Sequence, residues 1–395
     1  MIANRILKIE ESSTLAMAQK SRDLIKQGKK IINLSLGEPD FETPQFIKNA
    51  AKEAIDNNFS KYTPVAGYDD LRSAISKKFL RDNKLNYTKD QIVCSTGAKQ
   101  SLMQILLCIL NPNDQIILPS PYWVSYYQMI RFAKADPVIL KTSIENNFKI
   151  CAKKLKKNIT KKTKAFLINS PSNPTGAVYS KEELYDIAQV LKKHPDIIVI
   201  SDEIYEHINF TNNHTSIGEF LCTKKQVVTV NGLSKGFAMT GWRLGYMGGP
   251  RQIADACIKI QGQFTSGTCS ITQKAGVFAL SKDPVFTKKM KNEFKKRRDL
   301  TINLLKDIPG IKITKPEGAF YIFLDFSYYF NKKYNNTLIK NNDDLSMFLL
   351  KKAEVATVSG SAFGDSNCIR ISIASSENDL IEAISRIKKY LSKLS

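Results

Sequence analysis

The chain has 395 residues, of which 43% are hydrophobic and 24% charged, a composition typical of a folded globular protein with two domains. No apolar run approaches the roughly 18 residues that a membrane span needs, and the N-terminal segment lacks the apolar core of a secretory signal. Seven cysteines follow no paired spacing, and three histidines show no metal-ligand pattern. We therefore expect reduced thiols, a cytoplasmic location and no metal site.

The formal net charge of +22 raises the question of nucleic-acid binding. Basic clusters occur at Lys153–Lys164 and Lys288–Asp299, but neither contains a nucleic-acid-binding motif or interleaved aromatic side chains. Met290 and Phe294 lie four residues apart in the second cluster, so its lysines are expected to form a solvated helix face. We expect neither a nucleic acid nor a membrane as a partner.

At the N-terminal end, the pattern predicts a helix over 16–27 that stops at Gly28, then a strand over 31–36 and a turn at Gly37. A second helix is predicted over 44–57, and a Pro/Gly-rich loop with Tyr62 follows it. Taken alone, the turn is compatible with a purely structural role, and the tyrosine with an interface contact.

The segment 91–110 predicts a strand, a turn of small residues and an apolar helix. Backbone N–H groups at the start of a helix attract anions, so Ser95, Gly97 and Ala98 are candidates for binding a phosphate. Lys99 comes next, without the glycine run of a Walker A loop.

Three further strands end in side chains that could serve a site. Trp123 follows the first, and either packing in the core or stacking on a ring is open to it. The strand that begins at residue 165 ends in a Pro/Asn turn with Asn173, whose amide can donate a hydrogen bond. Asp202 ends an apolar strand, where a carboxylate needs a partner such as a protonated ring nitrogen, and Tyr205 follows three residues later.

A lysine lies directly after the apolar strand that begins at Val227. Burial of Lys235 among small and apolar residues would lower the pKa of its amine and make it a nucleophile able to form a Schiff base. Ser234 and Arg243 supply a hydroxyl and a fixed cation that suit a phosphate. Without further context, a solvated lysine in a surface turn remains the alternative.

Strands and helices alternate from residue 92 to 247, which predicts a mostly parallel sheet covered on both faces. The pattern then changes to a long basic helix, an alternating strand within 316–326 and an exposed excursion over 328–344. A last strand presents Arg370, which needs a carboxylate partner, either a protein side chain or a substrate α-carboxylate.

The lysine segment matches the pattern S-K-x-x-x-M-x-G-x-R-x-G-Y and so resembles the active-site motif of the class I, fold-type I aminotransferases, which use pyridoxal 5′-phosphate. The matching residues are Ser234, Lys235, Met239, Gly241, Arg243, Gly245 and Tyr246. The resemblance extends from Leu34 through the C-terminal helix and is greatest to the bacterial aspartate aminotransferases. It implies a large cofactor-binding domain over 46–289, a smaller α+β domain formed by 1–45 and 290–395, and a homodimer.

The resemblance also implies roles for the candidate residues. Lys235 would bind the cofactor and move the proton, while Asp202 would pair with the pyridine nitrogen. The other implied cofactor contacts are Asn173 and Tyr205 at the 3′ oxygen, Trp123 on the ring, and Ser95, Gly97, Ala98, Ser234, Arg243 and the partner's Tyr62 at the phosphate. The implied substrate contacts are Gly37, Trp123, Asn173, Arg370 at the α-carboxylate, and Lys99 with Ser12 and Thr14 at a side-chain carboxylate.

The expected reaction is transfer of the amino group of aspartate to 2-oxoglutarate, which gives oxaloacetate and glutamate. Within the same fold, aromatic, alanine or prephenate-type substrates and a carbon–sulfur lyase remain alternatives. Outside enzymes, the alternative is a basic binding protein without a cofactor.

Overall fold

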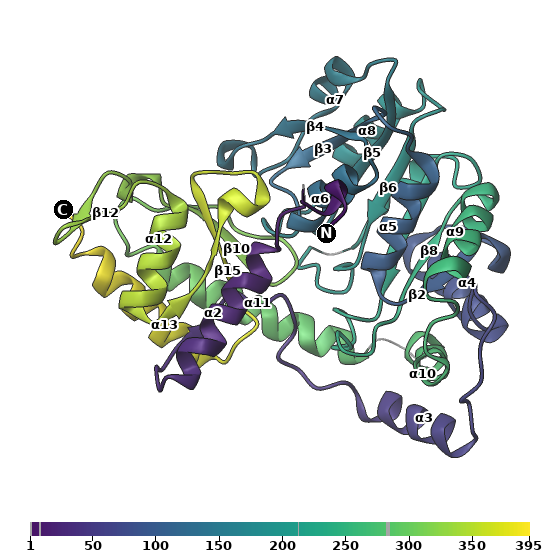
Figure 1. Ribbon diagram of the computed structural model, residues 1–395, viewed down its shortest axis with the longest axis horizontal. Coiled ribbons are helices and arrows are strands. Elements are labelled where there is room, and N and C mark those ends of the chain that lie inside the picture. The colour runs from purple at the N-terminus through teal and green to yellow at the C-terminus, as the bar shows by residue number, and fades with distance from the viewer. Residues whose placement is uncertain (1, 8, 212, 282–284) are drawn as a thin grey trace.

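The computed structural model describes residues 2–7, 9–211, 213–281 and 285–395, and its elements gather around two main sheets (Figure 1). The larger sheet has seven strands in the order β2-β8-β7-β6-β5-β3-β4. All neighbours are parallel except β8, which runs antiparallel to β2 and β7. Its strands are β2 Ile92–Ser95, β3 Gln115–Ser120, β4 Asp136–Lys141, β5 Thr163–Asn169, β6 Ile198–Asp202, β7 Val227–Gly232 and β8 Gly245–Gly248. The predicted mostly parallel α/β sheet is therefore confirmed.

Helices cover both faces of this sheet because its strands are apolar on both sides. Along β3, for example, Ile116 and Leu118 belong to one buried cluster and Ile117 to another. The helices of this part are α3 Gln45–Asp56, α4 Asp69–Asn83, α5 Ala98–Ile109, α6 Val124–Phe132, α7 Ala152–Asn158, α8 Lys181–Leu191, α9 Arg251–Phe264 and α10 Ser270–Ser281.

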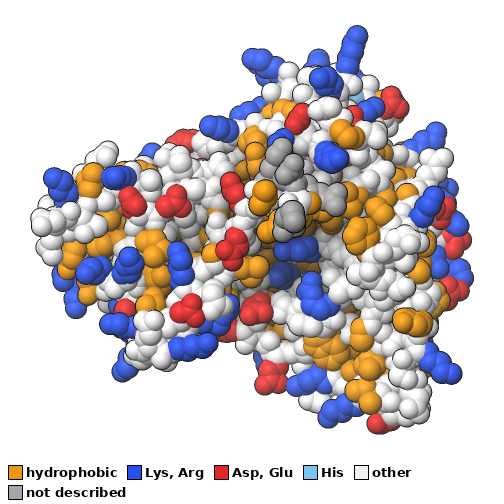
Figure 2. All heavy atoms as spheres, viewed as in Figure 1, with side chains coloured by type: hydrophobic (Ala, Val, Ile, Leu, Met, Phe, Trp, Pro, Cys, Tyr) orange, Lys and Arg blue, Asp and Glu red, His pale blue; other side chains and the backbone are white. Residues whose placement is uncertain are grey.

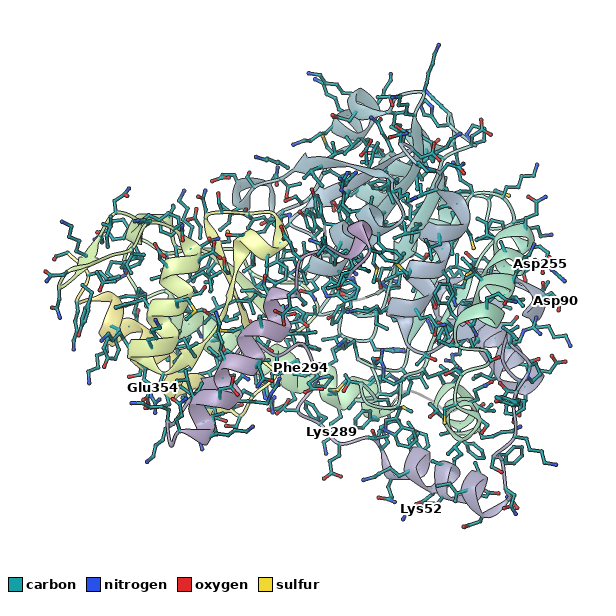
Figure 3. The ribbon with its side chains drawn as sticks, viewed as in Figure 1. Lys52, Asp90, Asp255, Lys289, Phe294 and Glu354 are labelled. Atoms are coloured by element: carbon teal, nitrogen blue, oxygen red, sulfur yellow. The ribbon has the colours of Figure 1, made fainter. Side chains whose placement is uncertain are left out.

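The second main sheet is antiparallel, with the order β14-β15-β10-β9. The core beside it contains the fully buried Phe294 of α11, whereas Lys289 on the same helix is exposed (Figure 3). The elements of this part are α11 Val285–Leu305, β9 Lys312–Ile313, β10 Tyr321–Asp325, β11 Lys333–Tyr334, β12 Thr337–Leu338, α12 Asn342–Phe348, β13 Val355–Ala356, β14 Val358–Ser359, β15 Cys368–Ser372 and α13 Glu377–Leu391. Short 3₁₀ turns lie at Lys89–Gln91, Ile144–Asn146, Ile217–Phe220, Ser327–Tyr329 and Gly360–Phe363, and a π turn at Leu349–Ala353.

The N-terminal arm contacts both parts of the molecule. It contains α1 Asn4–Leu7 and α2 Ser13–Lys26, and the latter lies along the smaller part (Figure 1). Met17 on α2 packs against Leu350 and Ala356, while the backbone N–H of Glu10 donates to Gln128 on α6. The residues just before α2 are thereby held above the ends of the large-sheet strands.

Three expectations about local structure are wrong in detail. The strand predicted over 31–36 shrinks to β1, Ile32–Asn33, because the chain then switches its hydrogen bonds from β13 to Ser372 at the end of β15. All five residues of β10 are buried, since this strand is covered on both faces. The segment 328–344 is exposed over most of its length, as expected, but Tyr329 and Ile339 belong to the core.

The charged and sulfur-containing residues largely follow the sequence-based expectations. Most lysines of α11 are exposed, but Arg297 and Arg298 of the same basic cluster are buried, the first against Asp40 and the second against the Pro316 carbonyl. All seven cysteines are free thiols. Within the described ranges, no helix has the length and apolar character to cross a membrane.

Candidate active site

A cavity of about 450 Å³ lies where the carboxyl ends of β5 and β6, the start of α5 and the N-terminal arm meet. Figure 2 shows Lys and Arg side chains inside a hollow near the middle of the visible face. The lining includes most of the residues singled out from the sequence: Ser12, Thr14, Gly37, Ala98, Lys99, Trp123, Asn173, Asp202, Tyr205, Ser234, Lys235, Arg243 and Arg370. Strand ends converge at this edge of the sheet, as is usual for sites of parallel α/β folds.

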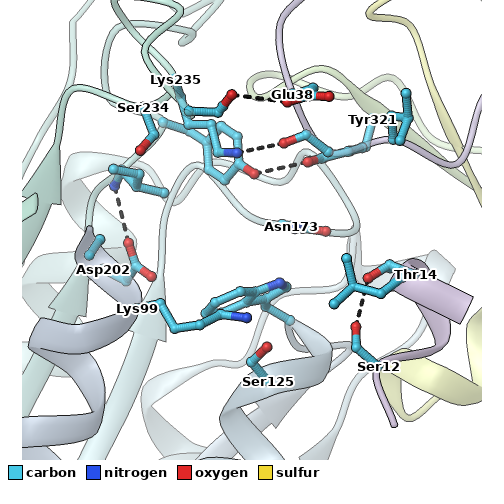
Figure 4. Close-up of a pocket in the computed structure, with 18 of the residues that line it drawn as sticks. Ser12, Thr14, Glu38, Lys99, Ser125, Asn173, Asp202, Ser234, Lys235 and Tyr321 are labelled. Atoms are coloured by element: carbon cyan, nitrogen blue, oxygen red, sulfur yellow. Dashed lines mark hydrogen bonds between the residues drawn. The ribbon is translucent and has the colours of Figure 1, made fainter. Parts of the chain in front are cut away.

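Lys235 lies in the turn after β7, and its Nζ donates a hydrogen bond to the Gly37 carbonyl (Figure 4). Burial is the main cause that lowers the pKa of Lys235 to about 8, and Arg370 and Arg243 act in the same direction. The nearby Glu38 carboxylate opposes this shift. Far more neutral amine is thus expected near neutral pH than for a lysine with an ordinary pKa, as a nucleophile or base requires.

Asp202 ends β6 and is 3% exposed. Its carboxylate accepts hydrogen bonds from the Tyr126 hydroxyl at 2.6 Å and from the Ile204 backbone N–H at 3.1 Å. Burial raises the pKa of Asp202 to about 6 despite these two hydrogen bonds. No side chain of the described residues forms an ion pair with it, so a cationic group of a ligand would find an unpaired carboxylate here.

The start of α5 faces Arg243. Gly97 has φ +86°, and a Cβ at this position would collide with the Arg243 guanidinium, so only glycine fits. The first N–H groups of the helix, including that of Ala98, have no acceptor within the helix. The structure does not bring Ser95 to the cavity wall: this side chain is fully buried, and its Oγ lies against Ser101 Oγ.

Arg370 of β15 is 1% exposed and has no carboxylate partner among the described residues. Its guanidinium donates to the Asn173 side-chain oxygen at 3.0 Å and to the Ser35 carbonyl at 2.7 Å, and its Nε–H makes no hydrogen bond. Because the Asn173 oxygen faces Arg370, the NH₂ group of that amide remains available as a donor. Of the two alternatives left open by the sequence, a structural ion pair is excluded for the described side chains.

Lys99 lies on the opposite wall from Lys235 (Figure 4). Its Nζ is 4.9 Å from the centre of the Trp123 ring, and no ion pair joins it to a described carboxylate. Burial and repulsion from Arg243 lower the pKa of Lys99. Ser12 and Thr14, whose hydroxyl oxygens are 2.9 Å apart, approach the cavity from the arm.

Charge in the cavity is unbalanced. Among the described residues, five cationic side chains line it, namely Arg22, Lys99, Lys235, Arg243 and Arg370, against the two carboxylates of Glu38 and Asp202. Unpaired cations in a partly desolvated cavity favour anionic ligands strongly. The geometry therefore suits a ligand that carries a carbonyl group for Lys235 and several negative groups.

The sequence reasoning missed several lining residues. Tyr126 supports Asp202, and Tyr321 shares a 3.0 Å hydrogen bond with Tyr205 through their hydroxyls. Glu38, which accepts from Thr240 at 2.9 Å, directly follows the predicted Gly37. Tyr126 could have been predicted, because it lies three residues after Trp123 and so on the same side of a helix. No local sequence pattern indicates that Tyr321 lies in the cavity wall.

Tyr62 lies outside the cavity of its own chain and is 97% exposed. The loop around it is nevertheless fixed, since Gln273 donates a 3.1 Å hydrogen bond to Thr63 Oγ1. Within one chain, the Tyr62 side chain therefore lies apart from the other candidate cofactor-binding residues.

Comparison with known proteins gives a consistent result. The model of the family "Aminotransferase class I and II" matches residues 29–387. A bifunctional aspartate aminotransferase and glutamate/aspartate-prephenate aminotransferase of Petunia hybrida is 46% identical over 99% of this chain and 82% of its own. An aspartate/prephenate aminotransferase of Nitrosomonas europaea is 43% identical over 99% of this chain and all of its own.

Solved structures agree with these relatives. The aspartate aminotransferase of Rhizobium meliloti superposes with a TM-score of 0.96, at 40% identity over the full length of both chains. The Thermus thermophilus aspartate aminotransferase with maleate gives 0.93, at 37% identity, with 98% of this chain and 99% of that chain covered.

The lowered pKa of Lys235 predicts selective chemistry in the protein without cofactor. An acylating reagent should modify Lys235 with a half-maximal rate near pH 8, about two units below ordinary lysines. Peptide mapping by mass spectrometry across pH 6–11 measures this, with the exposed Lys295 as the internal control. Identical pH profiles for the two lysines would contradict the desolvation argument.

Proposed function

Because the chain belongs to the class I and II aminotransferase family, we propose that it transfers the amino group of aspartate to 2-oxoglutarate with pyridoxal 5′-phosphate as its cofactor. The carrying observation is the pair of cations, Arg370 and Lys99, that face the cavity of Lys235 without carboxylate partners. Two separated cations match the two carboxylates of a short dicarboxylic amino acid. Family membership removes the cofactor-free binding protein from the alternatives.

The residues present fit the cofactor. The Arg243 guanidinium lies directly against Gly97, so a phosphate at this turn would meet that cation together with the first N–H groups of α5. Asp202 is a buried carboxylate that lacks a cation and would hold a protonated pyridine nitrogen. Ser234 would bind the phosphate, Asn173 and Tyr205 the 3′ oxygen, and Trp123 the ring face.

When bound, pyridoxal phosphate supplies an electron sink that makes the amino acid's Cα–H bond acidic. The chain's own residues do the rest. Lys235, as a neutral amine, would take the Cα proton on Nζ and return it to the ligand. Asp202 would be ionised opposite a cation, and this pairing would favour the protonated form of a bound pyridine nitrogen.

Substrate selection would depend on the second cation. Arg370 would bind the α-carboxylate through two N–H groups and so fix the Cα–H bond toward Lys235. Lys99 would hold the distal carboxylate, and the arm residues Ser12 and Thr14 would close over it. The Thermus thermophilus relative was solved with maleate, a four-carbon dicarboxylate, which supports this arrangement.

A second candidate activity is amination of prephenate. The names of the Petunia and Nitrosomonas relatives include it, and prephenate also carries two carboxylates. The division of the chain at 46–289 into a large domain and a small one remains part of the proposal, as does the cytoplasmic location.

Lys235→Ala should abolish turnover and leave the fold intact, because the lost amine is both the covalent anchor and the base. Borohydride reduction of the wild-type protein with pyridoxal phosphate, followed by peptide mapping, should label Lys235. An amino-donor panel with 2-oxoglutarate as the acceptor, and with prephenate as a second acceptor, then measures the activity. Label at another lysine would refute the assignment.

Lys99→Ala should lower kcat/KM for aspartate by about ten- to a hundredfold, since a charge-assisted contact contributes roughly 1.5–3 kcal/mol. Alanine and aromatic donors should be nearly unaffected because they lack the distal carboxylate. Lys181→Ala, which removes an exposed lysine in the first turn of α8, is the matched control. If every donor loses equally, Lys99 serves the phosphate or the fold, and the choice of aspartate loses its support.

We further propose a homodimer in which Tyr62 completes the partner's cofactor site. Its support is the fixed loop with a fully exposed Tyr62 and the other exposed apolar side chains Ile55, Phe264 and Phe278 of α3, α9 and α10. Figure 2 shows hydrophobic side chains gathered over the region where Figure 1 places α3 and α10. Such a patch is typical of an interface.

Mixing Tyr62→Phe protein with Lys235→Ala protein under conditions of subunit exchange should raise activity above that of the two separate preparations together. The hybrid dimer has one site with both Lys235 and the partner's Tyr62 intact. Sedimentation analysis checks the assembly, and Tyr185→Phe on exposed α8 is the matched control for Tyr62→Phe. A fully active isolated monomer would contradict the proposal.

A further inference from the structure

A cluster of buried charged and polar side chains lies behind the cavity and takes no part in the chemistry described above. It consists of Lys78, Asn83, Glu203, Glu206 and His214, which we call the rear cluster. Lys78 and Asn83 are 0% exposed, Glu203 is 1% and Glu206 is 6% exposed. None of the five lines the cavity.

Glu203 is the most heavily hydrogen-bonded member of the rear cluster. Its Oε1 accepts from Ser201 at 2.8 Å and from Ser216 at 2.5 Å. Its Oε2 accepts from Asn83 at 2.9 Å and contacts His214 Nε2 at 2.9 Å. Four groups from α4, β6 and the loop before Ile217–Phe220 therefore hold a single carboxylate.

Glu206 is held mainly from α4. Lys78 Nζ forms an ion pair with its Oε1, and Asn83 donates to its Oε2 at 2.7 Å. Lys78 also donates to the Asn83 side-chain oxygen at 2.7 Å. Because Asn83 donates to both glutamates, it joins the two carboxylates into one network.

The rear cluster holds the turn that presents two of the cavity residues. Asp202 and Tyr205 reach the cavity, while Glu203 and Glu206, which alternate with them in sequence, are held behind it. The Glu206 backbone N–H donates to the Glu203 carbonyl at 2.9 Å, and that of Glu203 donates to Val230 on β7 at 2.9 Å. A shift of either glutamate would therefore move Asp202 or Tyr205 with it.

Charge balance in the rear cluster depends on His214. Among the described residues, Lys78 is the one permanent cation that forms an ion pair with these two carboxylates, so a protonated His214 is needed for neutrality. Burial disfavours the imidazolium, but the hydrogen bond and charge of Glu203, together with Glu206, raise the pKa of His214 above its usual value. Loss of this proton would leave one uncompensated negative charge, and Glu203 already raises the pKa of neighbouring Asp202.

The other titratable groups around the rear cluster do not replace His214. On α4, Asp82 is paired with Arg81. His207 lies 3.3 Å from Glu206, but burial lowers its pKa, so it stays neutral. Tyr87 and Tyr246 stay neutral as well, because burial raises the pKa of both hydroxyls.

We propose that the rear cluster positions Asp202 and Tyr205 in the cavity. The proton on His214 keeps the cluster electrically neutral and so keeps these two side chains in place. The inference rests on the proposed cofactor site, toward which these two side chains point. Lys78 already supplies the cation at Glu206, which is why we assign an ionic network here, although donor atoms of Glu203, Glu206 and His214 lie within 4.8 Å of one another.

A double-mutant cycle tests the charge balance. Glu206→Gln leaves one excess positive charge, because Glu203 still favours the proton on His214. His214→Gln leaves one excess negative charge, and the double variant has none. Each single variant should weaken binding of pyridoxal phosphate to the cofactor-free protein by roughly five- to tenfold, and the double variant should recover most of that loss. Losses that multiply in the double variant would overturn the proposal.

The pH dependence provides an independent test with a variant that retains all of the buried carboxylates. His214 contributes while it is protonated, so the ratio of dissociation constants, His214→Gln over wild type, should be largest near pH 6 and approach one as pH rises through the raised pKa of His214. A ratio that does not change with pH would refute the role of the proton.

Asp325→Asn is the matched control, because it removes a buried carboxylate of the second sheet. It should leave the dissociation constant unchanged at every pH. Thermal melting of all variants separates loss of fold from loss of positioning. Failure of the wild-type protein itself to bind pyridoxal phosphate would instead refute the proposed function, so the two failures are distinguishable.

Discussion

Positive charge without a partner is the constraint on which the site depends. Among the described residues, the buried Arg370 guanidinium donates to an amide oxygen and a backbone carbonyl and lies over the Tyr321 ring, but it meets no carboxylate, so its burial is unfavourable unless an anion binds there. Lys99 and Arg243, which are more exposed, add two cations without a carboxylate partner among the described residues on other walls of the same cavity. The free-energy cost of burying this charge is tolerated because the large core of the chain stabilises the fold. A bound ligand with negative groups would then neutralise the excess positive charge of the cavity.

The same desolvation sets the chemistry of the two central residues in opposite directions. It lowers the pKa of Lys235 to about 8 and raises that of Asp202 to about 6, so that each is brought nearer to neutral pH. Both side chains follow ends of neighbouring parallel strands, β7 and β6, which places them in the cavity from one rigid edge. The centre of the site is thereby built from the ends of these strands and the turns that directly follow them.

Side chains on two sides hold the end of β6 and the turn that follows it: some line the cavity, and others lie behind it. On the cavity side, Tyr126 holds Asp202 and Tyr321 holds Tyr205. On the far side, Asn83 of α4, a helix more than 100 residues earlier in the chain, donates hydrogen bonds to Glu203 and Glu206 of the same turn. Polar networks of this kind specify one arrangement, because each displaced member leaves a buried charge unpaired.

The sequence by itself determined the alternation of strands and helices, the mostly parallel sheet, and the segments that carry Lys235, Asp202, Asn173 and Arg370, since apolar runs and strand-end polar residues are local signals. Tertiary structure alone decided which partners these residues meet. It placed Ser95, Tyr329 and Ile339 in the interior and Tyr62 on the surface. It also placed Tyr321 and Glu38 in the cavity wall, with the rear cluster behind it. These side-chain contacts join segments that are far apart in the sequence. Hydrophobic periodicity and motif spacing are local patterns and do not predict such contacts.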